Sequence, residues 1–172
     1  MSDSGTSSVG GSTLEKPESQ LLGLLSECSG RVDGRKKLMK LLFFSEYYDP
    51  KTDQLQPDEQ LGVFTDFTIY KYGPFSREVM DAFDELKQRG LVEEETTLTF
   101  SGNRKKEISL TDEGRQKAGN SDSDREIISV VADKLGEENG AELERISLLM
   151  LGIEREEKEV YRDTPVSDII VS

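Results

Sequence analysis

The sequence predicts an α+β fold that is mainly helical, with one small β-hairpin and a helical extension at the C-terminal end. Three observations support this class. Apolar residues recur at helical spacing in several separate segments, a run of β-branched and aromatic residues lies near residue 68, and two strand-like segments flank a polar turn near residue 102. A length of 172 residues fits one domain with a small appendage.

Two helices are predicted in the first 50 residues. Pro17 is suited to the first turn of a short amphipathic helix that ends near Gly30. The second helix begins after Asp33, a good N-cap residue, and ends at Asp49-Pro50. Its segment Leu38 to Phe44 is apolar on most of its circumference, so we expect this helix at the centre of the core.

The middle of the chain is predicted to hold a loop, a strand and a third helix. Residues 49–62 are polar and rich in turn residues, whereas 63–72 have the composition and alternation of a strand. Gly73-Pro74 is predicted to break that strand. A helix follows over Ser76 to Arg89, with Gly90 as its C-terminal stop.

A β-hairpin is predicted next, because the turn Ser101-Gly102-Asn103 joins the strand-like segments 91–100 and 104–110. Thr111 then caps a short helix that reaches about Ala118. The order of helix, helix, strand, helix and hairpin is typical of a winged helix. In that arrangement the third helix occupies the recognition position and the hairpin is the wing.

The predicted organisation has three parts. Residues 1–15 form a polar, Gly/Ser-rich leader that we expect to be disordered, residues 16–118 form the winged-helix-like domain, and residues 119–172 form the helical extension. The extension holds two apolar helices, 125–138 and 141–153. We expect 154–163 to prolong the second helix into solvent and the last residues to be loose. The apolar faces need a partner surface, which is either a second copy in a homodimer or the domain itself, and the homodimer is slightly favoured.

Two segments of the sequence resemble a known family. These are Lys37-Leu-Met-Lys-Leu-Leu-Phe-Phe44 and Tyr70-Lys-Tyr-Gly-Pro-Phe-Ser76. Together they are similar to the Panacea domain group and its YwgA-like relatives, over about residues 35–118. The resemblance implies an antitoxin or proteolytic adaptor that acts by direct contact with a partner protein. The hairpin and the Leu-Thr-Asp-Glu-Gly segment after it are closer to DNA-binding winged helices.

Composition excludes most enzymatic chemistry. The sequence has no histidine, which removes the commonest general base and metal ligand, and a single cysteine, Cys28, which removes thiolate metal clusters. No glycine pattern forms a phosphate-binding loop. We therefore expect no catalytic residues, no metal and no cofactor. The single cysteine and the lack of a signal peptide or membrane span predict a cytoplasmic protein.

The net charge of −13 restricts any nucleic-acid site to a local patch. A salt-rich cytoplasm would account for this acidity. Basic residues gather on the second helix and on the hairpin, where they could contact the phosphates of double-stranded DNA. The candidate nucleic-acid-binding residues are Arg35, Lys36, Lys37, Lys40, Arg77, Arg104, Lys105 and Lys106. The alternative is that the helix lysines are a solvated rim and the hairpin a solvated turn.

The Tyr-Gly-Pro turn is the candidate surface for a partner protein, through Tyr72, Gly73, Pro74 and Phe75. The structural interpretation is that Gly73 permits an unusual backbone angle, Pro74 fixes the helix entry, and Tyr70 and Tyr72 pack against the core. The same packing is expected of Tyr47 and Tyr48. Two functions therefore remain open: a regulator that binds DNA, and a module that binds a partner protein.

Overall fold

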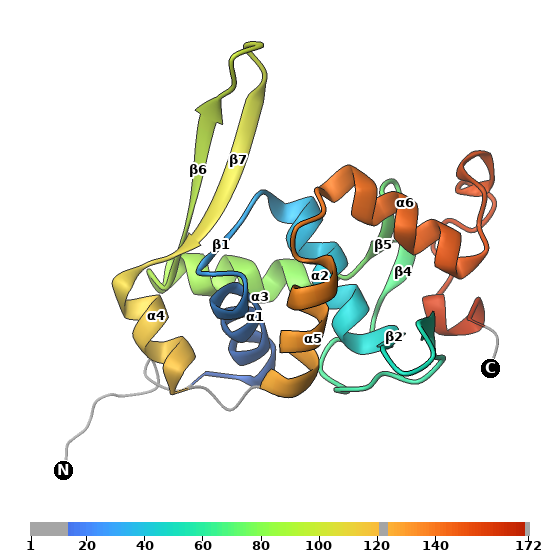
Figure 1. The fold of residues 1–172 in the computed structure, drawn as a ribbon, viewed down its shortest axis with the longest axis horizontal. Helices are drawn as coiled ribbons and strands as arrows, with labels where there is room; N and C mark the ends of the chain where they lie inside the picture. Colours follow the sequence, from blue (N-terminus) through green and yellow to red (C-terminus); the bar gives the residue numbers. More distant parts are fainter. Residues whose placement is uncertain (1–13, 121–123, 171–172) are drawn as a thin grey trace.

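The computed structural model describes residues 14–120 and 124–170, and it confirms the α+β class (Figure 1). The predicted leader lies almost entirely outside the described residues, as does part of the predicted linker near residue 122. The helices are α1 (Lys16–Glu27), α2 (Arg35–Tyr47), α3 (Arg77–Gln88), α4 (Asp112–Gly119), α5 (Arg125–Leu135) and α6 (Gly140–Leu151). The strands are β1 (Arg31–Val32), β2 (Tyr48–Asp49), β3 (Gln54–Leu55), β4 (Thr68–Tyr70), β5 (Gly73–Phe75), β6 (Val92–Leu98) and β7 (Arg104–Leu110).

Helix α2 lies at the centre of the core, as predicted. Its side chains from Lys37 to Tyr47 are all buried, and α1, α5 and α6 pack against it. Phe43 makes edge-to-face contacts with Phe44 and Phe67, with ring centroids 5.2 Å and 5.5 Å apart. Such pairs add to the free energy gained by burying apolar area.

The N-terminus of α2 differs from the prediction. The N-cap residue is Gly34, with a φ of 99°, and Asp33 does not cap the helix. The Asp33 carboxylate instead lies 3.3 Å from the Lys105 ammonium on β7. A glycine tolerates this positive φ, so the chain can turn sharply from β1 into α2.

The predicted strand over residues 63–72 is wrong for most of its length, because only β4 is a strand. The backbone N–H groups of residues 61–64 donate instead to the fully buried carboxylate of Glu46, at 2.8–3.0 Å. The predicted loop before it contains the small antiparallel pair β2–β3. A carboxylate on α2 thus replaces strand pairing as the partner for this segment.

Gly73-Pro74 does not break a longer strand but lies in a second one: β4 ends at Tyr70, and Gly73 and Pro74 begin β5. Strands β4 and β5 pair in antiparallel fashion, with Tyr70 opposite Gly73 and Lys71-Tyr72 as the connecting turn. Helix α3 then begins where predicted, with the Ser76 hydroxyl accepting a hydrogen bond from the Val79 N–H at 3.1 Å. The Tyr-Gly-Pro segment is therefore a tight hairpin that lies directly before α3.

The long hairpin β6–β7 confirms the prediction, and β1 pairs with the base of β7. It projects from the body of the molecule (Figure 1). Thr111 caps α4 as predicted, through a bond from the Gly114 N–H to its hydroxyl. The side chain of Phe100 at the tip is fully exposed.

The C-terminal segment departs from the prediction twice. Residues 154–163 do not prolong α6, because Gly152 adopts a left-handed φ of 74° and the chain turns back there. The following residues are not loose: Thr164 and Val166 bond to the backbone of Ile69 and Phe67, and Val166 is fully buried. The end of the described chain thus packs beside β4.

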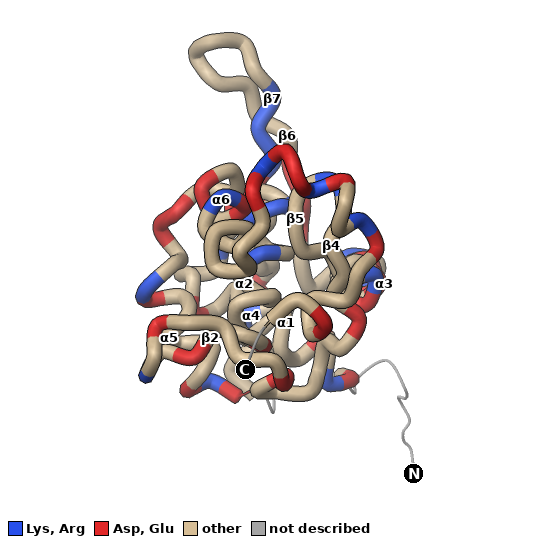
Figure 2. The backbone as a smooth tube through the Cα atoms, turned by 90° about the vertical axis from the view of Figure 1, so that its right-hand side faces the viewer, with Lys and Arg blue, Asp and Glu red and all other residues tan. Residues whose placement is uncertain are grey.

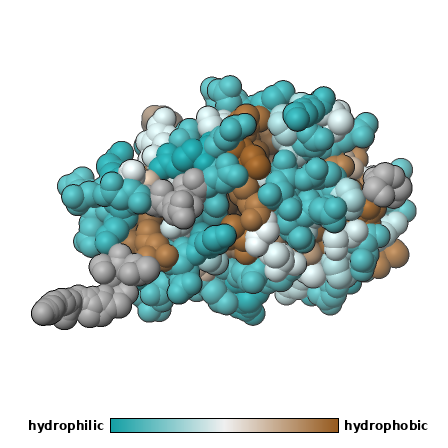
Figure 3. All heavy atoms as spheres, turned by 90° about the horizontal axis from the view of Figure 1, so that it is seen from below, coloured by the Kyte–Doolittle hydropathy of each residue, from teal (hydrophilic) through white to brown (hydrophobic). Residues whose placement is uncertain are grey.

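The apolar faces of α5 and α6 pack largely inside the chain, which supports the intramolecular alternative to pairing with a second copy. Ile128 and Val131 are buried, as are Leu143, Leu148 and Leu151. Leu149 stays 68% exposed. Much of the surface in Figure 3 is hydrophilic, with apolar patches between the hydrophilic residues. No helix within residues 14–120 and 124–170 could cross a membrane.

We predict that Glu46→Ala lowers the free energy of unfolding by at least about 3 kcal/mol, because it leaves four backbone N–H groups without their acceptor. Urea denaturation followed by circular dichroism measures this change. Asp133→Ala, which removes an exposed carboxylate from α5, is the matched control and should change stability by less than about 0.5 kcal/mol. A small effect of Glu46→Ala would contradict the assigned role.

Candidate functional site

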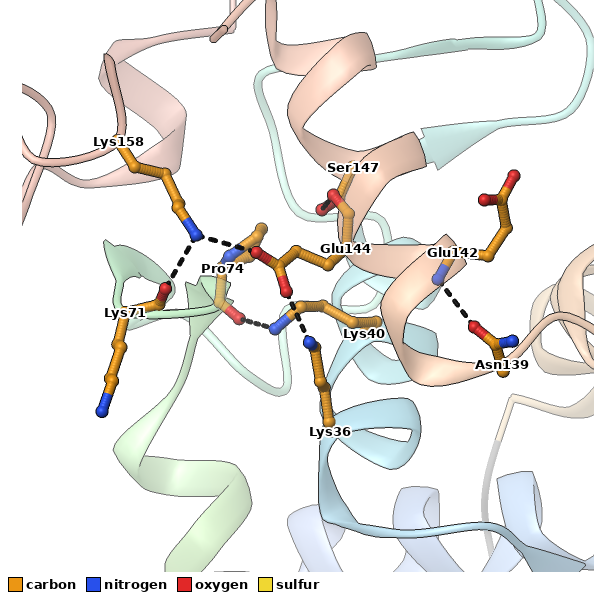
Figure 4. Close-up of polar contacts among 9 residues, drawn as sticks. All are labelled: Lys36, Lys40, Lys71, Pro74, Asn139, Glu142, Glu144, Ser147 and Lys158. Atoms are coloured by element: carbon orange, nitrogen blue, oxygen red, sulfur yellow. Dashed lines mark hydrogen bonds and ion pairs between the residues drawn. The ribbon is translucent and has the colours of Figure 1, made fainter. Parts of the chain in front are cut away.

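The candidate site is the place where α2, the β4–β5 turn, α6 and the segment after α6 meet (Figure 4). Its polar residues are Lys36 and Lys40 on α2, Glu144 on α6, and Lys158. We call these four residues the turn cluster, because they surround the Tyr-Gly-Pro turn. The cluster unites both sequence segments that define the family resemblance.

Lys40 is the most deeply buried member of the turn cluster, with 2% of its surface exposed. Its ammonium donates a 2.9 Å hydrogen bond to the backbone carbonyl of Pro74. Burial lowers the pKa of the Lys40 ammonium to about 7, although the nearby Glu144 carboxylate acts in the opposite sense. A charge in this position is tolerated only because it has these partners.

Glu144 is the counter-ion of the turn cluster. Its carboxylate forms ion pairs with the ammonium groups of Lys36 and Lys158, the latter at 2.9 Å. Burial acts to raise the pKa of this carboxyl, but the hydrogen bonds from the two lysines outweigh it and the pKa falls below its usual range. Lys158 also donates to the carbonyl of Lys71 at 3.0 Å.

The turn is therefore held at both ends by lysine side chains. The Lys71 carbonyl accepts from Lys158 and the Pro74 carbonyl accepts from Lys40 (Figure 4). Gly73 lies between them with a φ of 88°, and a Cβ atom there would be 3.6 Å from Glu144 Cγ and from Lys40 Cε. Glycine suits this position because of the positive φ.

The aromatic side chains of the turn point outward, which corrects the expectation that they pack against the core. Tyr72 is 51% exposed and Tyr70 is 42% exposed. Cations flank both rings: Lys36 Nζ lies 4.8 Å from the Tyr72 ring centroid, and Arg162 Cζ lies 5.0 Å from that of Tyr70. Such contacts hold an exposed ring in one orientation. Phe75 is half-buried beside Tyr70.

By contrast, Tyr47 and Tyr48 are buried, as the packing interpretation predicted. Their hydroxyl groups donate to the carboxylates of Glu59 and Asp53 respectively. These two tyrosines belong to the core and not to the candidate site.

The cations predicted on α2 do not form an open patch. Lys37 and Lys40 are buried, so they are not a solvated rim either. Arg35 binds Glu94 of β6 through two hydrogen bonds of 2.8 Å and 2.9 Å, and its guanidinium lies 4.8 Å from the Phe83 ring centroid. Most of the cationic side chains of α2 are thus buried or paired with groups of the same chain.

The remaining predicted nucleic-acid residues are exposed but lie on other elements. Arg104, Lys105 and Lys106 lie on the projecting part of β7, and Arg77 begins α3. The exposed side of α3 borders a groove of about 540 Å³. The acidic residues that line the groove are Glu15, Glu18, Glu78, Asp81 and Glu85, and the basic one is Arg89. Phosphate would be repelled from that side of the helix.

Sequence reasoning missed Glu144, Lys158 and Glu94. Glu144 and Ser147 lie on the same buried face of α6 as Leu143 and Leu148. A charged residue among apolar positions at helical spacing is the available signal, because a buried charge needs a partner. For Lys158 and Glu94 the sequence offers no comparable signal, since both are surrounded by other charged residues.

Within the described part of the chain, no group of three acidic, histidine or cysteine side chains is placed to hold a metal ion. The Cys28 thiol is partly buried, and burial raises its pKa.

Comparison with protein families gives one match. A family model described as "Antitoxin SocA-like, Panacea domain" matches residues 38–149. This range runs from α2 to α6, so it includes the turn, Lys40 and Glu144. No curated protein matches the sequence.

We predict that Lys40 makes the protein more stable as the pH rises from 7 to 9. The folded-state pKa is about 7 and the ordinary value is 10.5, so between these values the unfolded chain binds more protons than the folded one. The free energy of unfolding should therefore rise by about 2 kcal/mol more in the wild type than in Lys40→Met over this interval. Denaturation at each pH measures this.

The control for this prediction is Lys51→Met, at an exposed lysine, which should keep the wild-type pH dependence. Identical pH dependence in Lys40→Met and in the wild type would contradict the burial of a titrating ammonium at residue 40.

Proposed function

Because the chain belongs to the family of antitoxin SocA-like Panacea domains, we propose that it is a non-enzymatic regulatory protein of antitoxin type. In this proposal it acts by direct contact with a partner protein, such as a toxin. The contact surface is the β4–β5 turn with its exposed Tyr72. The lack of histidine in the sequence supports a role without catalysis.

The observation that carries the proposal is an exposed tyrosine on a rigid turn. Tyrosine is enriched among the residues that dominate binding energy at protein interfaces. Tyr72 lies between Lys36 and Lys71, whose ammonium groups are 4.8 Å and 5.5 Å from its ring centroid. The bonds from Lys40 and Lys158 hold the backbone on either side. A ring that is ordered before binding loses less conformational entropy in the complex.

We also infer a cytoplasmic location, where an antitoxin would meet its target. The single cysteine in the sequence supports this. One cysteine cannot form an internal disulfide, so the fold does not require an oxidising compartment. The acidity of the chain is consistent with a salt-rich cytoplasm, since Asp and Glu keep a protein soluble where salt screens charge.

We predict that co-expression with the product of the neighbouring gene in its own genome yields a stable complex. Tyr72→Ser should weaken the complex at least about 30-fold, the effect of losing one dominant interface residue. Because Tyr72 is 51% exposed, the midpoint of thermal unfolding should not change. Isothermal titration calorimetry measures the affinity.

Two control variants sharpen this experiment. Tyr72→Phe keeps the ring and its cation contacts and should bind like the wild type. Leu98→Ser removes an exposed apolar side chain from the long hairpin and should also leave the affinity unchanged. If no complex forms and growth inhibition by the neighbouring product is not relieved, the antitoxin proposal is wrong.

A second candidate function is contact with double-stranded DNA through the β6–β7 hairpin, used as the wing of a winged-helix-like domain. One observation favours it: Arg104, Lys105 and Lys106 are exposed on a projecting hairpin whose outer part carries no acidic residue (Figure 2). The acidic side of α3 and the internal pairing of Arg35 and Lys36 favour the protein partner instead.

We predict for this second function that reversing all three charges, to Glu at residues 104–106, abolishes duplex binding without unfolding the protein. The loss of affinity should be the same for duplexes of different base sequence, as expected for phosphate contacts. Fluorescence anisotropy with duplex DNA at several salt concentrations measures it. Equal binding by the variant, or none by the wild type at any salt concentration, would reject the DNA candidate.

A further inference from the structure

A pocket of about 400 Å³ lies at the foot of the long hairpin, where the chain passes from α1 through β1 into α2, beside β7 and α4 (Figure 1). Three cations line this pocket, namely Arg31, Lys37 and Arg115, and one carboxylate, that of Asp33. The remaining lining residues are small: Cys28, Ser29, Gly30 and Ser109. The pocket therefore has a surplus of two positive charges in a chain whose net charge is −13.

Lys37 is the most deeply buried of the three cations. Only 9% of its surface is exposed, yet no oxygen atom of residues 14–120 and 124–170 accepts a hydrogen bond from its ammonium or forms an ion pair with it. Burial raises the pKa of the Cys28 thiol and the Lys37 ammonium acts in the opposite sense, so the two groups are close together in the pocket wall. A buried ammonium without a partner costs free energy, which an anion in the pocket would recover.

Arg115 on α4 brings a second unpaired cation to the pocket. Its guanidinium lies over Gly30, where a Cβ atom would be 2.8 Å from Nη1 of the arginine. Gly30 also has a φ of 85°, so glycine suits both the backbone and the close approach of the side chain. Within the described part of the chain, this guanidinium likewise has no hydrogen-bond or ion-pair partner. Its donors are therefore available to a ligand.

The acidic groups near the pocket are already engaged. The Asp33 carboxylate lies 3.3 Å from the Lys105 ammonium on β7. The Glu107 carboxylate lies 3.5 Å from the guanidinium of Arg31, whose side chain is 62% exposed. An exposed pair at this distance is weak, so Arg31 can turn towards a bound anion at little cost.

We propose that this pocket binds the phosphate group of a small phosphomonoester. Such a group carries a charge of about −1.5 to −2 near pH 7, which matches the surplus of the pocket, whereas a chloride or a carboxylate would leave one charge unbalanced. A guanidinium can bind two phosphate oxygens at once, and an ammonium can bind a third. The hydroxyls of Ser29 and Ser109 are further donors in the wall. The volume lies within the range of about 300–1,000 Å³ that is usual for small-molecule pockets.

Isothermal titration calorimetry with inorganic phosphate, at constant ionic strength in sodium chloride, tests the proposal. Lys37→Met and Arg115→Met should each weaken binding at least about 10-fold, because each removes a charged hydrogen bond. Lys51→Met, at an exposed lysine, is the matched control and should bind like the wild type. Glycerol 3-phosphate should bind and glycerol should not. A wild type that binds neither phosphate compound, or equal binding by Lys37→Met, would overturn the proposal.

The stability of Lys37→Met distinguishes a binding role from a structural one. Without phosphate, the variant should unfold at or above the wild-type midpoint, because methionine keeps an apolar stem and removes an unpaired charge. With phosphate, the midpoint should rise with ligand concentration in the wild type and not in the variant. A variant that is clearly less stable than the wild type without phosphate would mean that the ammonium stabilises the fold itself, and the proposal would fail.

Alkylation of Cys28 by iodoacetamide locates the bound phosphate, since this is the only cysteine in the sequence and it lines the pocket. Saturating inorganic phosphate should slow the reaction in the wild type but not in Lys37→Met. An unchanged rate in the wild type would place the phosphate elsewhere. Equal protection by duplex DNA at the same phosphate concentration would assign the pocket to a nucleic-acid backbone and overturn the small ligand. The inference goes beyond the proposed antitoxin function, and Tyr72 is unchanged in every variant, so the two can fail separately.

Discussion

The hydrogen bond from the buried amino group of Lys40 is the interaction on which the rest of the site depends. It joins α2 to the β4–β5 turn through the Pro74 carbonyl, and the Glu144 carboxylate on α6 offsets part of the cost of burying the charged form. A buried charge without partners costs several kcal/mol, so the turn and α6 have to stay close to α2. Lys158 extends the same constraint to the segment after α6. The position of Tyr72 on the surface follows from these contacts.

Local signals were sufficient to predict the helices and the long hairpin. Ser76 and Thr111 cap helices where the sequence placed them, because a capping hydroxyl acts on a backbone N–H only a few residues away. Contacts between distant residues were not predictable. The carboxylate of Glu46 takes the N–H groups of residues 61–64, and Thr164 returns to pair with Ile69, although neither residue type implies that partner. The strand prediction near residue 65 failed for this reason.

The candidate site was predicted in part. The Tyr-Gly-Pro turn and the lysines of α2 were both identified from the sequence, but as separate features. The turn was assigned to a partner protein and the lysines to DNA. The lysines were expected at the surface, because lysine is seldom buried without a partner. The partner of Lys40 is a backbone carbonyl, which no side-chain pattern reveals. The tyrosines were expected in the core, yet flanking cations orient Tyr70 and Tyr72 at the surface.

The pairing of the cations also decides what the surface can bind. For Arg35 to contact a phosphate it would have to leave the buried carboxylate of Glu94, whose pKa it holds at about 2 together with Lys87. A charged hydrogen bond contributes about 1.5–3 kcal/mol, whereas a buried charge that loses its partner costs about 3–5 kcal/mol. The exchange is therefore unfavourable, and the same holds for Lys36 and Glu144. A partner then meets a surface whose charges are already paired, so apolar and aromatic contacts such as those of Tyr72 have to supply most of the affinity.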